Sequence, residues 1–155
     1  MTDVFAALDV VESAFGPFCQ ELDPQAVDAA QAAAGVERLA RVERWAAGAR
    51  LRLAEQIDQS IVGEGENSKA RWLAQQTGQS TRDAARDLGV TDALAGLDAT
   101  DAALRSGELS ATQAHEVASA AVLDPSAEAG LLGLAREGSL AELKRAAKKV
   151  RAAAT

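Results

Sequence analysis

The spacing of apolar residues along the chain predicts helices from end to end. Apolar positions recur at intervals of three and four residues, and no segment shows the strict alternation of a half-buried strand. Glycines and prolines mark helix ends, and Ser, Thr or Asp residues precede the next apolar stretch as N-caps. We therefore predict an all-α fold, in which long N-terminal helices precede a bundle of short helices.

Residues 1–65 form the first predicted region, which is acidic and helical. A helix is expected at residues 2–16, where the letters GPF end it. Asp23 and Pro24 suit the N-cap and the first position of a second, long helix, which is predicted over about residues 24–61.

Within this long helix, one set of apolar residues repeats with the three- and four-residue steps of a heptad. The set consists of Leu39, Val42, Ala46, Ala49 and Leu53. Two interpretations are open: these residues pack against other helices of their own chain, or they form the interface of a homodimer. Because the set spans fewer than three heptads and uses alanines, packing within the chain is the simpler interpretation.

A linker rich in glycine and acidic residues, VGEGENS, precedes the second predicted domain at residues 66–155. This domain contains short helices, and two pairs of them resemble helix-turn-helix units, in which a tight turn joins two short helices. The first pair is ARWLAQQTGQSTRDAARDL, and the second surrounds SGELSATQAHEV. An ordinary helical hairpin has the same pattern, so these pairs alone do not establish DNA binding.

Charge is distributed unevenly over the chain, whose formal net charge is -7. Residues 1–65 carry 5 basic and 11 acidic side chains, whereas residues 136–155 carry 6 basic and 2 acidic ones. Five of these cations fall in LKRAAKKVR, where a helix would turn them away from its apolar stripe. Such cations either complement the helix dipole or contact the phosphates of duplex DNA with little sequence preference.

Duplex DNA is therefore the predicted partner, and base contacts are expected from the early residues of the second helix in each helix-turn-helix-like pair. The predicted DNA-binding residues are Arg82, Arg86, Thr112, Gln113, Lys144, Arg145, Lys148, Lys149 and Arg151. The alternative function is protein–protein interaction or dimerisation through the long acidic helix. The sequence alone does not decide between DNA binding and protein–protein interaction.

Residues suited to catalysis or metal binding are scarce. His115 is the only histidine and Cys19 the only cysteine, whereas zinc sites use three or four such ligands. No serine or cysteine near His115 shows a nucleophile motif. We therefore predict no enzyme activity, metal, cofactor or small-molecule substrate for this chain.

The single cysteine, the lack of a signal peptide and the lack of a long apolar run favour the cytoplasm over a membrane.

Three motifs in order, RWLAQQTGQSTRDAAR, ALRSGELSATQA and LLGLAREGSLAELKRAAKKV, resemble an actinobacterial helical domain family of unknown function, the mycobacterial REP-type repeat proteins. In that family the domain usually lies N-terminal to an HNH endonuclease domain, so the resemblance implies a nuclease-associated DNA-binding module. Asp83, Asp87 and Asp92 dilute a helix that is often arginine-rich in the family. HNH nucleases need several histidines, so the single His115 implies that the nuclease domain is absent here and belongs to any longer parent protein.

Overall fold

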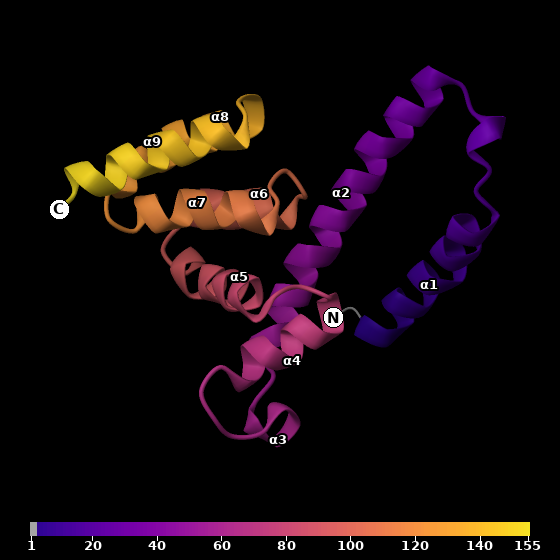
Figure 1. Ribbon diagram of the computed structural model, residues 1–155, viewed down its shortest axis with the longest axis horizontal. Helices are drawn as coiled ribbons and strands as arrows, with labels where there is room; N and C mark the ends of the chain where they lie inside the picture. The colour runs from indigo at the N-terminus through magenta and orange to yellow at the C-terminus, as the bar shows by residue number, and fades with distance from the viewer. Residues whose placement is uncertain (1–2) are drawn as a thin grey trace. The chain divides into compact units, whose positions relative to one another are not determined.

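The computed structural model describes residues 3–155, and within them the secondary structure is entirely helical, which confirms the all-α prediction. Figure 1 shows the order of the elements along the chain. The helices are α1 (Val4–Glu21), α2 (Ala29–Ala54), α3 (Gln59–Val62), α4 (Ser68–Thr77), α5 (Thr81–Leu94), α6 (Asp98–Arg105), α7 (Ala111–Ala121), α8 (Glu128–Glu137) and α9 (Leu140–Ala153). Two short 3₁₀ turns, η1 (Pro24–Ala26) and η2 (Pro125–Ala127), precede α2 and α8.

Serine caps begin three of the short helices where the sequence predicts them. The backbone amide of Asp83 donates to Ser80 Oγ at 3.0 Å, and that of Glu142 donates to Ser139 Oγ at 3.1 Å. Ser110 forms a complete capping box, because its amide also donates to Gln113 Oε1 at 2.8 Å. These bonds satisfy amides that have no partner inside the helix, so the local sequence determines where α5, α7 and α9 begin.

The N-terminal helix is longer than predicted. We expected it to end at residue 16, but α1 continues through Pro17 as far as Glu21. Proline fixes a backbone φ that is compatible with a helix, and α1 tolerates both the loss of the donor to the Ser13 carbonyl and the crowding of that carbonyl by the ring. A proline in the middle of an apolar stretch was therefore a weaker end signal than the sequence interpretation assumed.

The second helix is shorter than predicted, at Ala29–Ala54 rather than about residues 24–61. Pro24 starts only the turn η1, and the helix begins where the Asp28 carboxylate and the Gln31 side chain each accept the other's backbone amide, at 2.8 and 3.0 Å. After Ala54 the chain leaves the helix, and Asp58 caps the separate helix α3. Local capping residues thus interrupt a stretch whose apolar pattern looks continuous.

Contacts divide the chain into two compact units, Met1–Arg38 and Leu39–Thr155. We predicted the boundary at residues 65 and 66, but the glycine-rich linker lies inside the second unit. The reason is that Leu51, near the end of α2, is buried in one cluster with Leu73 of α4 and Ala84 of α5. In the first unit, the described residues include none that is buried.

The second unit is built around α7, which packs against α5, α6, α8 and α9. Figure 1 shows α6 and α7 as a middle layer between α5 and the pair α8 and α9. Buried alanines on α7 allow the neighbouring helices to approach closely, and larger side chains fill the remaining space. The largest fully buried apolar side chains are Leu73, Leu104, Leu109, Leu143, Val90 and Val117.

A glycine joins α2 to the turn between α6 and α7. Gly107 has a φ of +77°, a conformation that L side chains rarely adopt. A Cβ atom at this position would lie 2.6 Å from Cδ1 and Nε1 of Trp45, which is on α2. Arg44 Nε donates a hydrogen bond to the Gly107 carbonyl. Glycine is therefore needed here both for its backbone conformation and for the close approach of α2.

Candidate nucleic-acid interface

Helix α7 is the core of the second unit and not an exposed recognition helix. Six of its 11 residues are buried, and none of the others is fully exposed. We predicted Thr112 and Gln113 at an exposed helix start, but both are half-buried. Gln113 completes the capping box and also donates through Nε2 to the carbonyl of Ala135, at 3.0 Å. Their predicted full exposure is therefore not observed, because four other helices pack around α7, and their contact with DNA stays a prediction.

Arg86 of the first helix-turn-helix-like pair also has an internal role. Its guanidinium lies 3.4 Å from an Asp83 oxygen and 3.3 Å from an Asp87 oxygen, and it donates to Thr112 Oγ1 at 3.4 Å. Asp87 is only 5% exposed and accepts a second hydrogen bond from Gln79 Nε2 at 2.7 Å. Arg86 thus links α5 to α7 and compensates a buried carboxylate, and its predicted contact with DNA stays a prediction.

The first predicted pair, α4 and α5, has an accessible outer face. The turn between them uses Gly78 at a φ of +77°, and its amide donates to the Ala74 carbonyl at 2.9 Å. The exposed side of α5 follows three- and four-residue steps and bears mostly small side chains. It consists of Thr81, Arg82, Ala85, Gly89 and Asp92. Among the predicted base-reading residues, only Arg82 therefore remains on an exposed surface.

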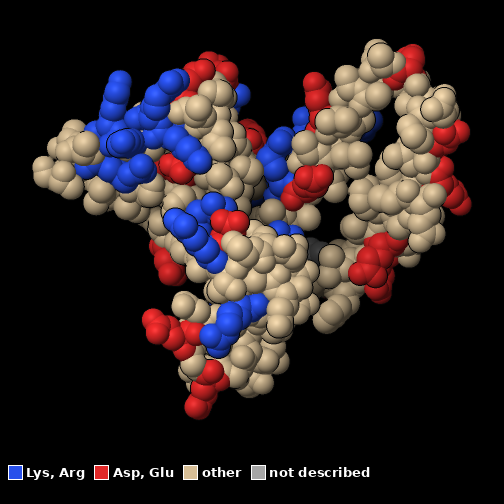
Figure 2. All heavy atoms as spheres, in the orientation of Figure 1, with Lys and Arg blue, Asp and Glu red and all other residues tan. Residues whose placement is uncertain are grey.

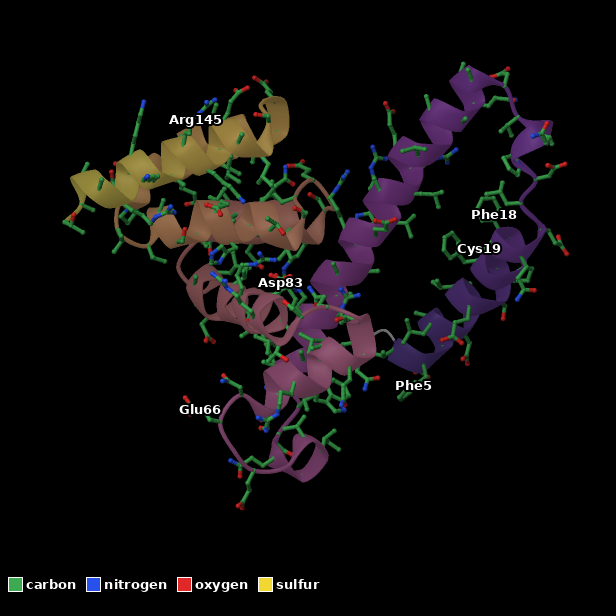
Figure 3. All side chains as sticks on the ribbon, in the orientation of Figure 1. Phe5, Phe18, Cys19, Glu66, Asp83 and Arg145 are labelled. Carbon is green, nitrogen blue, oxygen red and sulfur yellow. The ribbon has the colours of Figure 1, made fainter. Side chains whose placement is uncertain are left out.

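The last helix exposes four cations in a row. Lys144, Arg145, Lys148 and Lys149 are exposed, and within residues 3–155 none of them forms an ion pair with an acidic side chain. We call this set the α9 basic face. Figure 2 shows Lys and Arg side chains gathered at the end of the molecule where α9 lies, and Figure 3 shows Arg145 on the outer side of that helix. On the inner side, Leu143 and Ala147 are buried.

Arg151, the fifth predicted cation on α9, belongs to the interior side. It is half-buried, its Nη1 donates to Ser119 Oγ at 2.8 Å, and the same atom lies 3.8 Å from Glu116 Oε2. Both partners are on α7, so Arg151 ties α9 to the central helix. The described contacts of Arg151 are thus structural, and its predicted contact with DNA stays a prediction.

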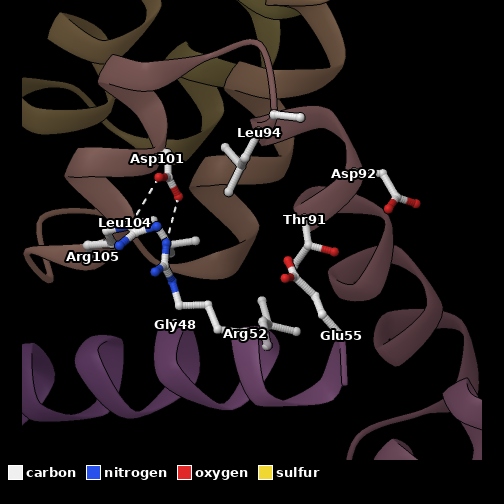
Figure 4. A pocket seen from close by; sticks show the side chains of 11 residues that line it. Gly48, Arg52, Glu55, Thr91, Asp92, Leu94, Asp101, Leu104 and Arg105 are labelled. Atoms are coloured by element: carbon white, nitrogen blue, oxygen red, sulfur yellow. Dashed lines mark hydrogen bonds and ion pairs between the residues drawn. The ribbon is translucent and has the colours of Figure 1, made fainter. Parts of the chain in front are cut away.

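A groove between α2, α5 and α6 is a second feature of this unit, and the sequence did not reveal it. Its volume is about 650 Å³, and Figure 4 shows its lining. Leucines form the floor, and charged groups of both signs form the rim, where Asp101 pairs with Arg52 at 2.9 Å and with Arg105 at 3.0 Å. The lining residues come from three separate stretches of sequence, so no local motif could have indicated the groove.

The structure places the remaining reactive side chains far from any metal-like arrangement. No group of three or more His, Cys, Asp or Glu side chains suited to a metal occurs in the described residues. His115 lies half-buried on α7, and this burial lowers its pKa below the usual value, with Glu116 opposing the shift and Arg86 adding to it. Cys19 is exposed on α1.

None of the described helices combines the length and apolar character that crossing a membrane requires.

Comparisons with models of known protein families, with curated proteins and with solved structures found no match to this chain. The resemblance of the three motifs to the actinobacterial family therefore stays an expectation drawn from the sequence.

Proposed function

We propose that this chain is a non-catalytic helical module that binds duplex DNA through the α9 basic face. The observation that carries the proposal is the exposure of four neighbouring cations without ion-pair partners on a chain whose net charge is -7. Unpaired cations on one helix face bind DNA phosphates and release counterions from the duplex. The acidic groups elsewhere repel DNA, so the charge distribution favours approach through α9.

The helix dipole does not account for these cations. Favourable interaction with the dipole is confined to the last turn of a helix. Only Arg151 lies in the last turn of α9, and its side chain is directed to Ser119 and Glu116. The four residues of the α9 basic face lie farther from the helix end, so a different reason for their clustering is needed.

Binding through this face is expected to be weak and nearly independent of sequence. Four neutralised phosphates give a log–log salt slope of about -3.6, from about -0.9 per phosphate. Arg82 is the one predicted base-reading residue that the structure leaves exposed, and Figure 1 shows α5 and α9 on opposite sides of α7. With one exposed residue of this set, on a different helix from the α9 basic face, base reading is expected to make a minor contribution.

Fluorescence anisotropy with a random-sequence duplex at low salt tests the proposal. Lys144→Glu with Lys148→Glu should abolish binding and leave the helical circular dichroism unchanged, because both side chains are exposed. The matched control is Arg41→Glu with Arg71→Glu, which makes the same charge change at exposed positions on α2 and α4 that take part in none of the described ion pairs. Equal loss of binding in the control, or no binding by the wild type, would contradict the proposal.

The non-catalytic part of the proposal is tested separately. The resemblance implies that a nuclease domain belongs to a longer parent protein, and this chain offers one histidine for metal chemistry. We expect no nicking of supercoiled plasmid by the pure chain in Mg²⁺ or Mn²⁺. Nicking that disappears in His115→Ala would show the chain to be an enzyme.

A second function, dimerisation through α2, is favoured by the exposure of the predicted heptad residues. We call Leu39, Val42, Ala46, Ala49 and Leu53 the α2 seam. The side of α2 that is buried in the second unit bears Gly48, Leu51 and Ala54, which fall on the opposite side of the helix from the seam. Ala46, Ala49 and Leu53 are exposed, and Leu39 and Val42 are half-buried. The seam is thus available for a partner.

A further inference from the structure

Helix α1 carries an apolar face without a core to cover it. Side chains at steps of four and three residues form this face, and we call them the α1 seam: Val4, Leu8, Val11, Phe15, Phe18 and Leu22. Each is between 36% and 52% exposed. The rings of Phe15 and Phe18 stack with centroids 5.7 Å apart, as expected for neighbours on one helix face. In Figure 3, Phe18 projects from the helix near its end.

An amphipathic helix of this kind needs a partner. Most helical stability in proteins comes from packing an apolar face against a partner. Pro17 in the interior of α1 weakens this helix. Apolar patches of this extent on monomers usually mark an interaction site. The α1 seam is therefore expected to be covered in the working form of the protein.

Charge selects the partner of the α1 seam. Helix α1 contains Asp9, Glu12 and Glu21 and no basic residue, so two copies of α1 would repel each other. Helix α2 carries five arginines against two glutamates. Helical spacing places Glu12 and Glu21 on either side of the α1 seam, and Arg38 and Arg50 on either side of the α2 seam, where Glu43 is the single acidic neighbour. The two seams therefore match in heptad spacing and are opposite in flanking charge.

We propose that the α1 seam packs on the α2 seam of a second copy, so that a two-fold dimer makes this contact twice. The proposal rests on the α2 interface suggested above and names the segment that covers it. Two-fold symmetry lets each copy bury both of its seams. Stable association needs about 800 Å² per partner, and making the contact twice doubles the area that each copy buries.

Register favours a second copy over closure within one chain. A connector at residues 22–28 would set an antiparallel hairpin in which Val4 lies level with about Ala46, since helices rise 1.5 Å per residue. Leu53, which is 48% exposed, would then lie beyond the end of α1. In a second copy the connector does not limit the register, so the phenylalanines can cover the Leu39 to Leu53 part of the seam.

Multi-angle light scattering after size exclusion tests the proposal first. The wild type should have twice the chain mass of 16.0 kDa, and Phe15→Asp with Phe18→Asp should return it to the monomer mass. The matched control, Ser13→Asp with Gln20→Asp, adds the same charge on the opposite side of α1 and should stay dimeric. A monomeric wild type, or a phenylalanine variant that remains dimeric, overturns the proposal.

Charge exchange identifies which helices pair. Arg38→Glu with Arg50→Glu should weaken the dimer at least tenfold, and adding Glu12→Arg with Glu21→Arg should restore it. Failure of the exchange to restore the dimer would show that α1 does not meet α2 in the second copy.

Cysteine crosslinking gives a readout that does not depend on destabilising variants. Cys19 lies at the edge of the α1 seam and is the only native thiol. Oxidation of Ala46→Cys, Ala49→Cys or Leu53→Cys should give a covalent dimer that is lost with Cys19→Ser. Crosslinks only within one chain, efficient dimer formation through Cys19 in the wild type, or none at any of the three positions would overturn the proposal.

These results are separable from those on DNA binding and on the α2 seam. A dimer that is broken by Leu39→Asp with Leu53→Asp, but not by the phenylalanine variant, would support the α2 interface and reject the role of α1. Lys144→Glu with Lys148→Glu should leave the dimer mass unchanged, because the α9 basic face lies outside both seams.

Discussion

Helices α7 and α9 begin with the same capping signal, but they differ in how far their side chains are buried. Ser110 and Ser139 each accept the amide of the third helical residue, so both helices start with a serine cap. Yet α7 has no exposed residue, whereas α9 exposes its four-residue basic face. Small side chains on most sides of α7 let helices pack all around it, while the cations of α9 are too costly to bury without partners. Segregated charge, not a cap, is therefore the more reliable sign of an exposed helix face.

The largest effect should come from a charge in the centre of α7. Val117 is fully buried, so Val117→Asp places a carboxylate where it has no partner, at a cost of several kcal/mol. We expect loss of cooperative folding of the second unit, measured by thermal circular dichroism. Lys148→Asp on α9 is the comparison variant, and it should keep the wild-type melting curve. If both variants unfold at the same temperature, the difference in burial between α7 and α9 has no effect on stability.

The next largest loss of stability should come from a substitution at Gly107, in the turn that leads into α7. Gly107→Ala introduces a Cβ 2.6 Å from Trp45 in addition to an unfavourable positive φ, so stability should fall by about 3 kcal/mol or more. Gly78→Ala is the matched control, because it has the same φ but nothing within 4 Å of the added atom. It should cost only about 1–3 kcal/mol in urea unfolding. Equal losses in the two variants would mean that the approach of α2 to this turn contributes nothing.

Two arginines on α5 separate a structural role from a surface role. Arg86→Ala leaves the buried Asp87 without its ion pair and should lower the free energy of unfolding by about 1–3 kcal/mol. Arg82→Ala removes an exposed side chain and should change stability by less than about 0.5 kcal/mol. Urea unfolding of both variants measures the difference. A stable Arg86→Ala protein with weaker DNA binding would support the predicted role of this residue in DNA contact and contradict the structural role.

The smallest effect concerns His115 on α7. Burial lowers the pKa of this side chain in the folded protein, so as pH falls the unfolded chain, with an ordinary histidine pKa of about 6.5, takes up the proton first. The free energy of unfolding should therefore decrease as pH falls through 6.5, and the loss should level off below the folded-state pKa. In His115→Gln this dependence should be weaker between pH 8 and 6, where carboxylates stay ionised. An unchanged pH profile would show that the burial of His115 has no energetic consequence.

Much of the fold and part of the candidate site followed from local sequence. Apolar spacing, serine caps and glycine ends were enough to predict the short helices, because those signals act within one turn of the chain. The exposure of Lys144, Arg145, Lys148 and Lys149 was predictable too, since their positions relative to Leu143 and Ala147 depend only on helical spacing.

Only the packing of the helices decided which surfaces remain free. Four of the predicted DNA-binding side chains hydrogen-bond to groups on other helices: Arg86, Thr112, Gln113 and Arg151. No local sequence pattern shows that Arg151 will meet α7 or that Gln113 will meet the Ala135 carbonyl. The unit boundary inside α2 has the same origin, because Leu51 is buried by residues that follow the glycine-rich linker. Periodicity places a side chain on one side of a helix, but the residues that cover that side come from distant parts of the chain.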